Sequence, residues 1–141
     1  MTAESCFVDT NILVYCFEKS DSSKKRTAQR LLNKLMDEDR LRLSTQVLQE
    51  LYVTLTRKVR VPSTSQEVLT VLEDLAVWPV ATVDFLSIRA AIELSDGTRI
   101  SFWDALILVT AAQSGASILY TEDLNDRQQI LGVRIANPFH H

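Results

Sequence analysis

The segment from Cys6 to Tyr15 places the strongest single constraint on how this chain can fold. An apolar run, Cys6-Phe7-Val8, ends at Asp9, passes through two small polar residues and becomes apolar again. This pattern predicts a buried strand that carries Asp9 at its carboxyl end and leads into a helix. Ligands of open α/β sheets lie outside the carboxyl ends of the strands, and a carboxylate beside an apolar core is costly unless it is paired or binds a metal. Asp9 is therefore a candidate functional residue, although capping of the next helix would also explain it.

The rest of the chain alternates between helical and strand patterns. Apolar residues at helical spacing predict helices over 12–17, 24–36, 46–60, 65–75, 85–96 and 102–113. Short strands are expected at 41–45, 77–80, 116–120 and 133–135. This alternation predicts an α/β sandwich around a parallel sheet. We expect one domain over residues 1–139, followed by a tail, His140 and His141, that is either tag residue or native sequence.

Three more acidic positions are predicted at the edge of the sheet that carries Asp9. Glu50 lies on the helix after the second strand, and the acidic segment 121–126 follows a later buried strand. Asp104 lies in the first turn of a helix that runs antiparallel to the strands and so begins over their carboxyl ends. Taken alone, Glu50 could be a rim residue and Asp104 a capping acid favoured by the helix dipole. Their shared edge indicates a functional site.

This acidic cluster predicts a metal. Four carboxylates in one pocket repel one another and stay partly protonated unless a cation joins them. Oxygen ligands without histidine or cysteine favour Mg²⁺ or Mn²⁺ over zinc. Ions held by acidic side chains commonly act on phosphodiesters, where they orient water and stabilise the leaving oxygen.

Composition excludes several other classes of protein. The net charge of −3 and the pI near 5.3 argue against a generic nucleic-acid-binding module, but not against an enzyme that acts on nucleic acid. Three glycines are too few and too scattered for a phosphate-binding glycine loop. Cys6 and Cys16 lack zinc spacing and are expected to be reduced. No apolar run reaches 18 residues and no signal-peptide pattern precedes Cys6, so we expect no membrane span and a cytoplasmic protein.

With these residues, the sequence resembles the PIN domain, specifically the VapC-type toxins of bacterial and archaeal toxin–antitoxin pairs. The matching segments are Val8-Asp9-Thr10-Asn11-Ile12-Leu13, Glu50, Phe102-Trp103-Asp104-Ala105 and Thr121-Glu122-Asp123-Leu124. Their order and approximate spacing match over essentially the whole chain, and the ordered set is more specific than any one motif.

The resemblance implies a fold, an activity and partners. The fold is a three-layer PIN-like sandwich with a five-stranded parallel sheet in the order 3-2-1-4-5. The activity is that of an endoribonuclease that depends on Mg²⁺ or Mn²⁺. The partners are an RNA substrate, a cognate antitoxin and a second copy of the chain in a homodimer.

The resemblance also implies roles for individual residues. The matched catalytic acids are Asp9, Glu50, Asp104 and Asp123. Asp9, Asp104 and Asp123 would hold one or two metal ions, and Glu50 would complete the shell or orient water. The supporting residues are the pocket-lining Thr10, Asn11 and Thr121 and the additional acids Glu122 and Asp126, whose role the resemblance leaves open.

Two other readings remain open at this point. A nuclease of the same fold could act in RNA maturation outside a toxin pair. A non-catalytic acidic α/β binding module would explain Asp9, but it would not explain Asp104 together with Glu50.

Overall fold

A sheet of six strands forms the middle layer of the structure, a computed structural model that describes residues 4–139. The strands are β1 (Cys6–Val8), β2 (Leu41–Ser44), β3 (Val80–Ala81), β4 (Ile118–Tyr120), β5 (Gln129–Ile130) and β6 (Val133–Ala136). They lie in the order β3-β2-β1-β4-β6-β5. Every neighbouring pair is parallel except β5 and β6, so the carboxyl ends of five strands share one edge of the sheet.

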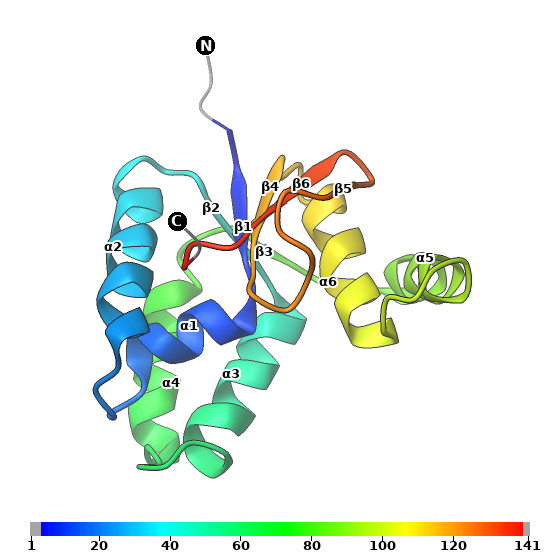
Figure 1. The fold of residues 1–141 in the computed structure, drawn as a ribbon. Coiled ribbons are helices and arrows are strands. Elements are labelled where there is room, and N and C mark those ends of the chain that lie inside the picture. Colours follow the sequence, from blue (N-terminus) through cyan, green and yellow to red (C-terminus); the bar gives the residue numbers. More distant parts are fainter. Residues whose placement is uncertain (1–3, 140–141) are drawn as a thin grey trace.

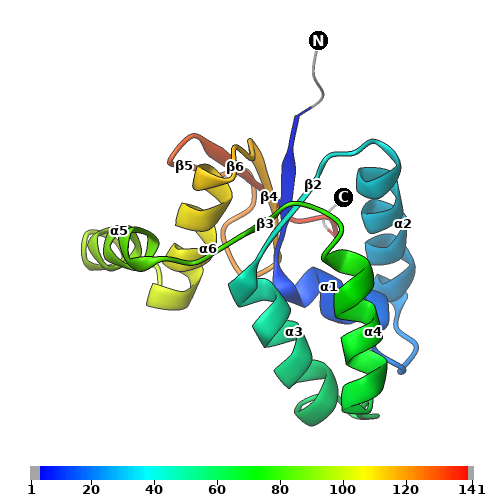
Figure 2. The ribbon, with the colours of Figure 1, turned by 180° about the vertical axis from the view of Figure 1, so that it is seen from behind.

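Helices cover both faces of the sheet (Figure 1). On one side lie α1 (Thr10–Phe17) and α2 (Ser23–Asp37), which pack against each other. On the other side lies α6 (Phe102–Gln113), with α5 (Phe85–Asp96) packed outside it. The view from behind shows α3 (Thr45–Arg57) and α4 (Ser65–Leu75) paired below the carboxyl ends of the strands (Figure 2). The predicted three-layer α/β sandwich is confirmed.

The strand β1 lies in the middle of the sheet and is the most buried strand. Its three side chains, Cys6, Phe7 and Val8, are all fully buried, because helices cover both faces of the sheet at this position. The apolar helix α6 is buried over the seven residues from Ala105 to Ala111 because it packs between the sheet and α5. Asp9 directly follows β1 and caps α1, so the polypeptide turns away from the sheet as soon as this buried strand ends.

Local capping signals in the sequence fix the starts of α3, α4 and α6. Ser44 accepts a hydrogen bond from the backbone N–H of Val47 at the start of α3. Thr64 and Glu67 form a reciprocal capping box at the start of α4, as their spacing predicts. The side chain of Ser101 accepts a hydrogen bond from the backbone N–H of Asp104 and thereby sets where α6 begins.

The sheet differs from the prediction in two places. The five parallel strands follow the expected order, but a sixth strand, β5, was not predicted and pairs antiparallel with β6. The strand expected at 77–80 is only Val80–Ala81. Pro79 has no N–H to donate, and its carbonyl oxygen accepts a single bond from the N–H of Leu43 before regular pairing begins. No helix within residues 4–139 is long and apolar enough to cross a membrane, and the tail at 140–141 lies outside that range.

The missed strand depends on an unusual turn. Leu131 and Gly132 connect β5 to β6, and both have positive φ angles, 54° and 77°. Two central residues with positive φ make the mirror-image turn that matches the twist of a hairpin, for which Asn-Gly is the preferred pair. Leucine is a poor residue at the first of these positions, because its Cβ crowds the backbone in the left-handed region. The sequence therefore gives little sign of the hairpin.

We expect Leu131→Asn to stabilise the protein. Asparagine tolerates positive φ better than leucine, and the Leu131 side chain is 54% exposed, so little buried apolar surface is lost. The gain should be about 0.5–1 kcal/mol, which corresponds to a rise in Tm of roughly 2–4 °C. Leu69→Asn, at a 46% exposed position within α4, is the matched control and should lower Tm slightly, because asparagine is a poorer helix former. A Tm for Leu131→Asn at or below the wild-type value would contradict the assignment of strain to Leu131.

Candidate functional site

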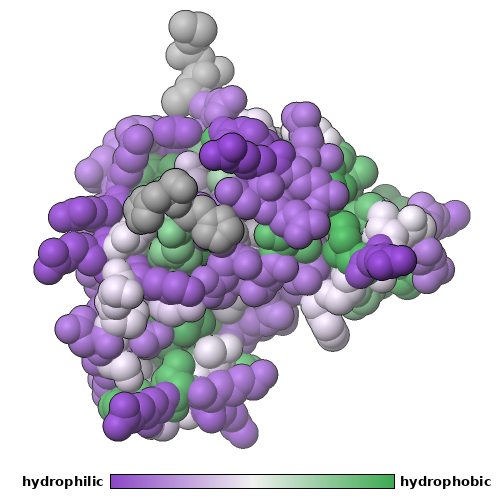
Figure 3. Space-filling model, in the orientation of Figure 1, coloured by the Kyte–Doolittle hydropathy of each residue, from purple (hydrophilic) through white to green (hydrophobic). Residues whose placement is uncertain are grey.

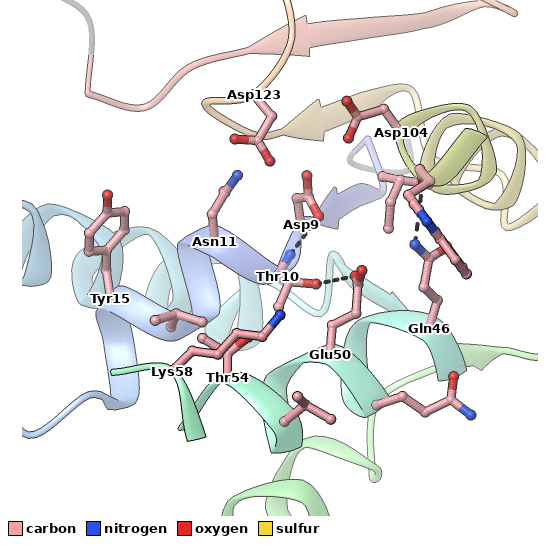
Figure 4. Close-up of a pocket in the computed structure, with 15 residues that line it drawn as sticks. Asp9, Thr10, Asn11, Tyr15, Gln46, Glu50, Thr54, Lys58, Asp104 and Asp123 are labelled. Atoms are coloured by element: carbon pink, nitrogen blue, oxygen red, sulfur yellow. Dashed lines mark hydrogen bonds between the residues drawn. The ribbon is translucent and has the colours of Figure 1, made fainter. Parts of the chain in front are cut away.

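A pocket opens at the carboxyl edge of the sheet, between α1, α3, α6 and the loop that follows β4 (Figure 4). Its volume is about 710 Å³. All four predicted catalytic acids line it: Asp9, Glu50, Asp104 and Asp123. They come from four different segments, so the topology of the sheet brings together residues that are up to 114 positions apart in the sequence.

Asp9 lies at the bottom of this pocket and is only 5% exposed. Its Oδ1 accepts a hydrogen bond of 2.7 Å from the backbone N–H of Thr10, and its Oδ2 accepts one of 2.8 Å from the hydroxyl of Thr121. Burial nevertheless raises the pKa of Asp9 to about 7, with smaller contributions from the charges of Asp123 and Glu50. Two hydrogen bonds therefore compensate only part of the cost of this buried charge.

Glu50 and Asp104 approach the pocket from helices on either side of Asp9. The hydroxyl of Thr10 donates a hydrogen bond of 2.8 Å to Oε1 of Glu50, which fixes one oxygen of that carboxylate (Figure 4). Burial raises the pKa of Asp104, a hydrogen bond with Ser101 lowers it, and the charges of Asp123 and Glu50 raise it further. The carboxylates thus act on one another electrostatically across the pocket.

Thr121 organises the opposite wall through its hydroxyl group. That group donates to Asp9 and accepts from the backbone N–H of Asp123 at 3.1 Å and from Nδ2 of Asn11 at 3.4 Å. Asp123, in the loop after β4, is held by this contact to the backbone. Oδ1 of Asn11 is buried and has no partner among residues 4–139, so an oxygen acceptor is available beside the acids.

The remaining supporting acids lie away from the pocket. Glu122 accepts hydrogen bonds from the hydroxyl of Tyr15 at 2.6 Å and from the ammonium of Lys24 at 2.7 Å. Burial opposes ionisation of Glu122, but these two partners outweigh it and lower its pKa. Asp126 accepts a bond of 2.8 Å from the backbone N–H of Asn137. Both acids thus fasten the loop that carries Asp123 to neighbouring parts of the fold.

The acids match a hard divalent cation in chemical type. Carboxylates and an unpaired amide oxygen are the ligands that Mg²⁺ and Mn²⁺ prefer. Burial, with smaller contributions from the charges of Asp123 and Glu50, raises the pKa of Asp9, and a bound cation would offset this penalty. As the side chains stand, no three His, Cys, Asp or Glu residues between positions 4 and 139 are close enough together to hold one ion. The pocket therefore supplies suitable donors on several walls, without a closed ligand cage.

The structure adds pocket residues that the sequence reading did not select. Gln46, Thr54 and Lys58 extend the line of Glu50 at intervals of four residues along α3 and its C-cap, and all line the pocket. This spacing places them in one row on the helix surface, beside the buried row of Val47, Leu51 and Leu55. A row of polar residues that borders a row of apolar residues on the same helix was thus the sequence signal by which these pocket residues could have been found.

The aromatic residues Tyr15 and Trp103 also line the pocket. Trp103 precedes Asp104 and remains 61% exposed, and its carbonyl oxygen accepts a hydrogen bond of 3.4 Å from the side chain of Gln46. This bond joins the beginnings of α3 and α6, which carry Glu50 and Asp104. Helical periodicity marks Trp103 only as a first-turn residue, so its exposure could not be predicted from the sequence.

Comparison with known proteins decides the family. The model of the PIN domain family matches residues 6–128, which include all four acids. The chain belongs to the PIN domain family. The resemblance seen in the sequence motifs is thereby confirmed, and so is the PIN-like fold. No curated protein matches the sequence.

Solved structures agree on the fold. A toxin–antitoxin complex from Klebsiella pneumoniae matches with a TM-score of 0.72 and 20% identity, over 97% of this chain and 100% of the other. VapC20 from Mycobacterium tuberculosis, described as a toxin that cleaves the sarcin–ricin loop, matches with a TM-score of 0.67 and 22% identity, over 84% and 92%. VapBC2 from Rickettsia felis, bound to a DNA fragment from its promoter, matches with a TM-score of 0.66 and 23% identity, over 94% and 97%.

The raised pKa of Asp9 predicts an unusual dependence of stability on pH. Between the ordinary carboxyl pKa of 3.8 and the folded-state pKa of about 7, the folded protein holds a proton that the unfolded chain has lost. The free energy of unfolding should therefore fall as pH rises through this range, by a few kcal/mol in order of magnitude. Asp9→Asn cannot titrate, so in chelator it should lose most of this slope and be more stable than wild type above pH 7.

Urea unfolding at several pH values in EDTA measures this effect. Asp74→Asn, at an exposed position on α4, makes the same chemical change outside the pocket and should leave the wild-type slope in place. If Asp9→Asn and wild type kept parallel profiles, the buried carboxylate would be compensated in the folded protein, contrary to the pKa assigned here.

Proposed function

We propose that this PIN-domain protein is an endoribonuclease that depends on Mg²⁺ or Mn²⁺ and hydrolyses RNA phosphodiester bonds. The observation that carries the proposal is the pocket that Glu50, Asp104 and Asp123 share with Asp9, whose buried carboxylate forms no ion pair with any residue from 4 to 139. A divalent cation offsets the cost of this burial and, when bound, polarises the scissile phosphate and lowers the pKa of water. The VapC neighbours share the fold in which this arrangement occurs.

Each side chain then has a distinct task in the proposed reaction. Asp9, Asp104 and Asp123 are the residues that would hold the cation. Thr121 keeps Asp9 and the backbone of Asp123 in place through one hydroxyl group. Glu50, with one oxygen fixed by Thr10, has a second oxygen that can orient water towards the phosphate. Water would attack the phosphorus in line with the leaving 3′ oxygen, which would give 5′-phosphate and 3′-hydroxyl ends.

We further propose that the protein is the toxin of a type II toxin–antitoxin pair. Two structural neighbours are a toxin–antitoxin complex and a VapBC protein, which supports a small protein antitoxin as a partner. A nuclease of RNA maturation would share the pocket, and a small antitoxin gene directly upstream would distinguish the toxin from it. Both cysteines are free and buried, which agrees with a reducing cytoplasm.

The surface of α5 supports the proposed protein–protein contacts. Phe85, Leu86 and Ile92 are 71%, 66% and 48% exposed, an unusual density for one short helix. Hydrophobic residues appear at the surface in the region of α5 and α6, among hydrophilic ones, whereas the face over α2 is mainly hydrophilic (Figure 3). A homodimer or an antitoxin would remove these side chains from water.

The central test is cleavage of a labelled single-stranded RNA. Wild-type protein should cleave it with Mg²⁺ or Mn²⁺ and should stop when EDTA is in excess, because the proposed reaction needs the cation to polarise the phosphate and lower the pKa of water. Asp9→Asn should lower the rate at least about a hundredfold, since it removes a ligand of the cation. Asp74→Asn, on the exposed face of α4, should cleave at the wild-type rate.

Two results would reject this function. Sustained cleavage in excess EDTA by protein free of contaminating nuclease would exclude the metal mechanism. Absence of cleavage by the wild type with either ion, together with retained RNA binding, would favour a non-catalytic acidic binding module.

A further inference from the structure

Lys58 is a cationic side chain in a pocket lined by four carboxylates. It is the C-cap residue of α3, it lines the pocket, and its side chain extends toward Thr10 and the middle of the pocket (Figure 4). Lys58 nevertheless forms no ion pair or side-chain hydrogen bond with any residue from 4 to 139. An ammonium whose only purpose was to neutralise the acids would be expected to pair with one of them.

The place of Lys58 on α3 is also informative. It shares the polar row of Glu50, two helical steps of four residues further on, which corresponds to about 12 Å along the axis. A long side chain on a helix leans back toward the N-terminus, so the ammonium comes closer to Glu50 than the backbone does. Lys58 therefore lies in line with the proposed reaction centre without touching it.

Two more cations lie within two residues of Lys58 in the sequence. Arg57 and Arg60 are exposed and form no ion pair within the part of the chain that the structure describes. Of these three cations Lys58 lines the acidic pocket, and Arg57 and Arg60 flank Lys58 in the sequence. A group of cations next to the pocket attracts a polyanion.

We propose that Lys58 binds a backbone phosphate of the RNA strand, next to the phosphate that is cut, with Arg57 and Arg60 extending the contact along the strand. This assignment deepens the proposed ribonuclease function and rests on it. In this assignment the RNA strand runs along α3. Glu50 faces the reacting phosphate, and the C-terminal end of the helix binds a neighbouring phosphate. Lys58 is a binding residue, so its loss should weaken substrate affinity more than the chemical step.

The first experiment measures RNA binding without cleavage. Anisotropy of a labelled single-stranded RNA is followed in the Asp9→Asn background at fixed Mg²⁺ and rising NaCl. Adding Lys58→Gln should weaken binding and reduce the slope of log affinity against log salt by about 0.7, the value for one lost phosphate contact on a single strand. Lys58→Arg should retain the slope. Lys34→Gln, an exposed lysine on α2 outside the pocket, removes the same charge and should change neither quantity.

The second experiment separates this inference from the function on which it rests. In otherwise wild-type protein, Lys58→Gln should raise KM several-fold and leave kcat within about twofold, since only a binding contact is lost. Equal effects of Lys58→Gln and Lys34→Gln on affinity and salt slope would overturn the role of Lys58, even if the protein cleaves RNA. A fall in kcat with unchanged KM would overturn it as well. Failure of the wild type to cleave would reject the nuclease while the binding experiment still decides on Lys58.

Discussion

The structure depends on one unfavourable interaction, the burial of the Asp9 carboxylate at the end of the most buried strand. Hydrogen bonds from Thr10 and Thr121 hold this group, yet its pKa remains raised to about 7 because burial outweighs them. A protein that needed only a helix cap could place such a residue in water. A buried carboxylate at this position favours the binding of a cation by the folded chain, and the proposed chemistry rests on this property.

The fold brings the other acids to Asp9 through strand order. Since β1 is central and β4 is its parallel neighbour, the segments after both strands emerge side by side. The helices α3 and α6 begin at the same edge and are joined by the bond between Gln46 and Trp103. Asp9, Glu50 and Asp104 are thus anchored at different helices and Asp123 in a loop held by Thr121, so the pocket can tolerate the repulsion among them because contacts elsewhere fix their positions.

The sequence allowed the layers and the shared edge of the four pocket acids to be predicted from local patterns, whereas the order of the parallel strands was implied by the resemblance to the PIN domain. An apolar run ending at Asp9 is visible without any tertiary information. The β5–β6 hairpin was missed because Leu131 occupies a backbone conformation that its residue type disfavours. The directions of Glu122 and Asp126 could not be predicted either, since adjacent acids in a loop point toward partners that only the folded chain supplies.

The bond network of Glu122 has a consequence for its neighbour in the sequence. Lys24 and Tyr15 hold Glu122 from α2 and α1, and the backbone of Asp123 is held by Thr121. A loop fixed on both sides has already lost most of its conformational entropy when the chain folds. Little further ordering of the backbone is then needed when Asp123 engages a ligand, so little ordering entropy opposes the binding step itself.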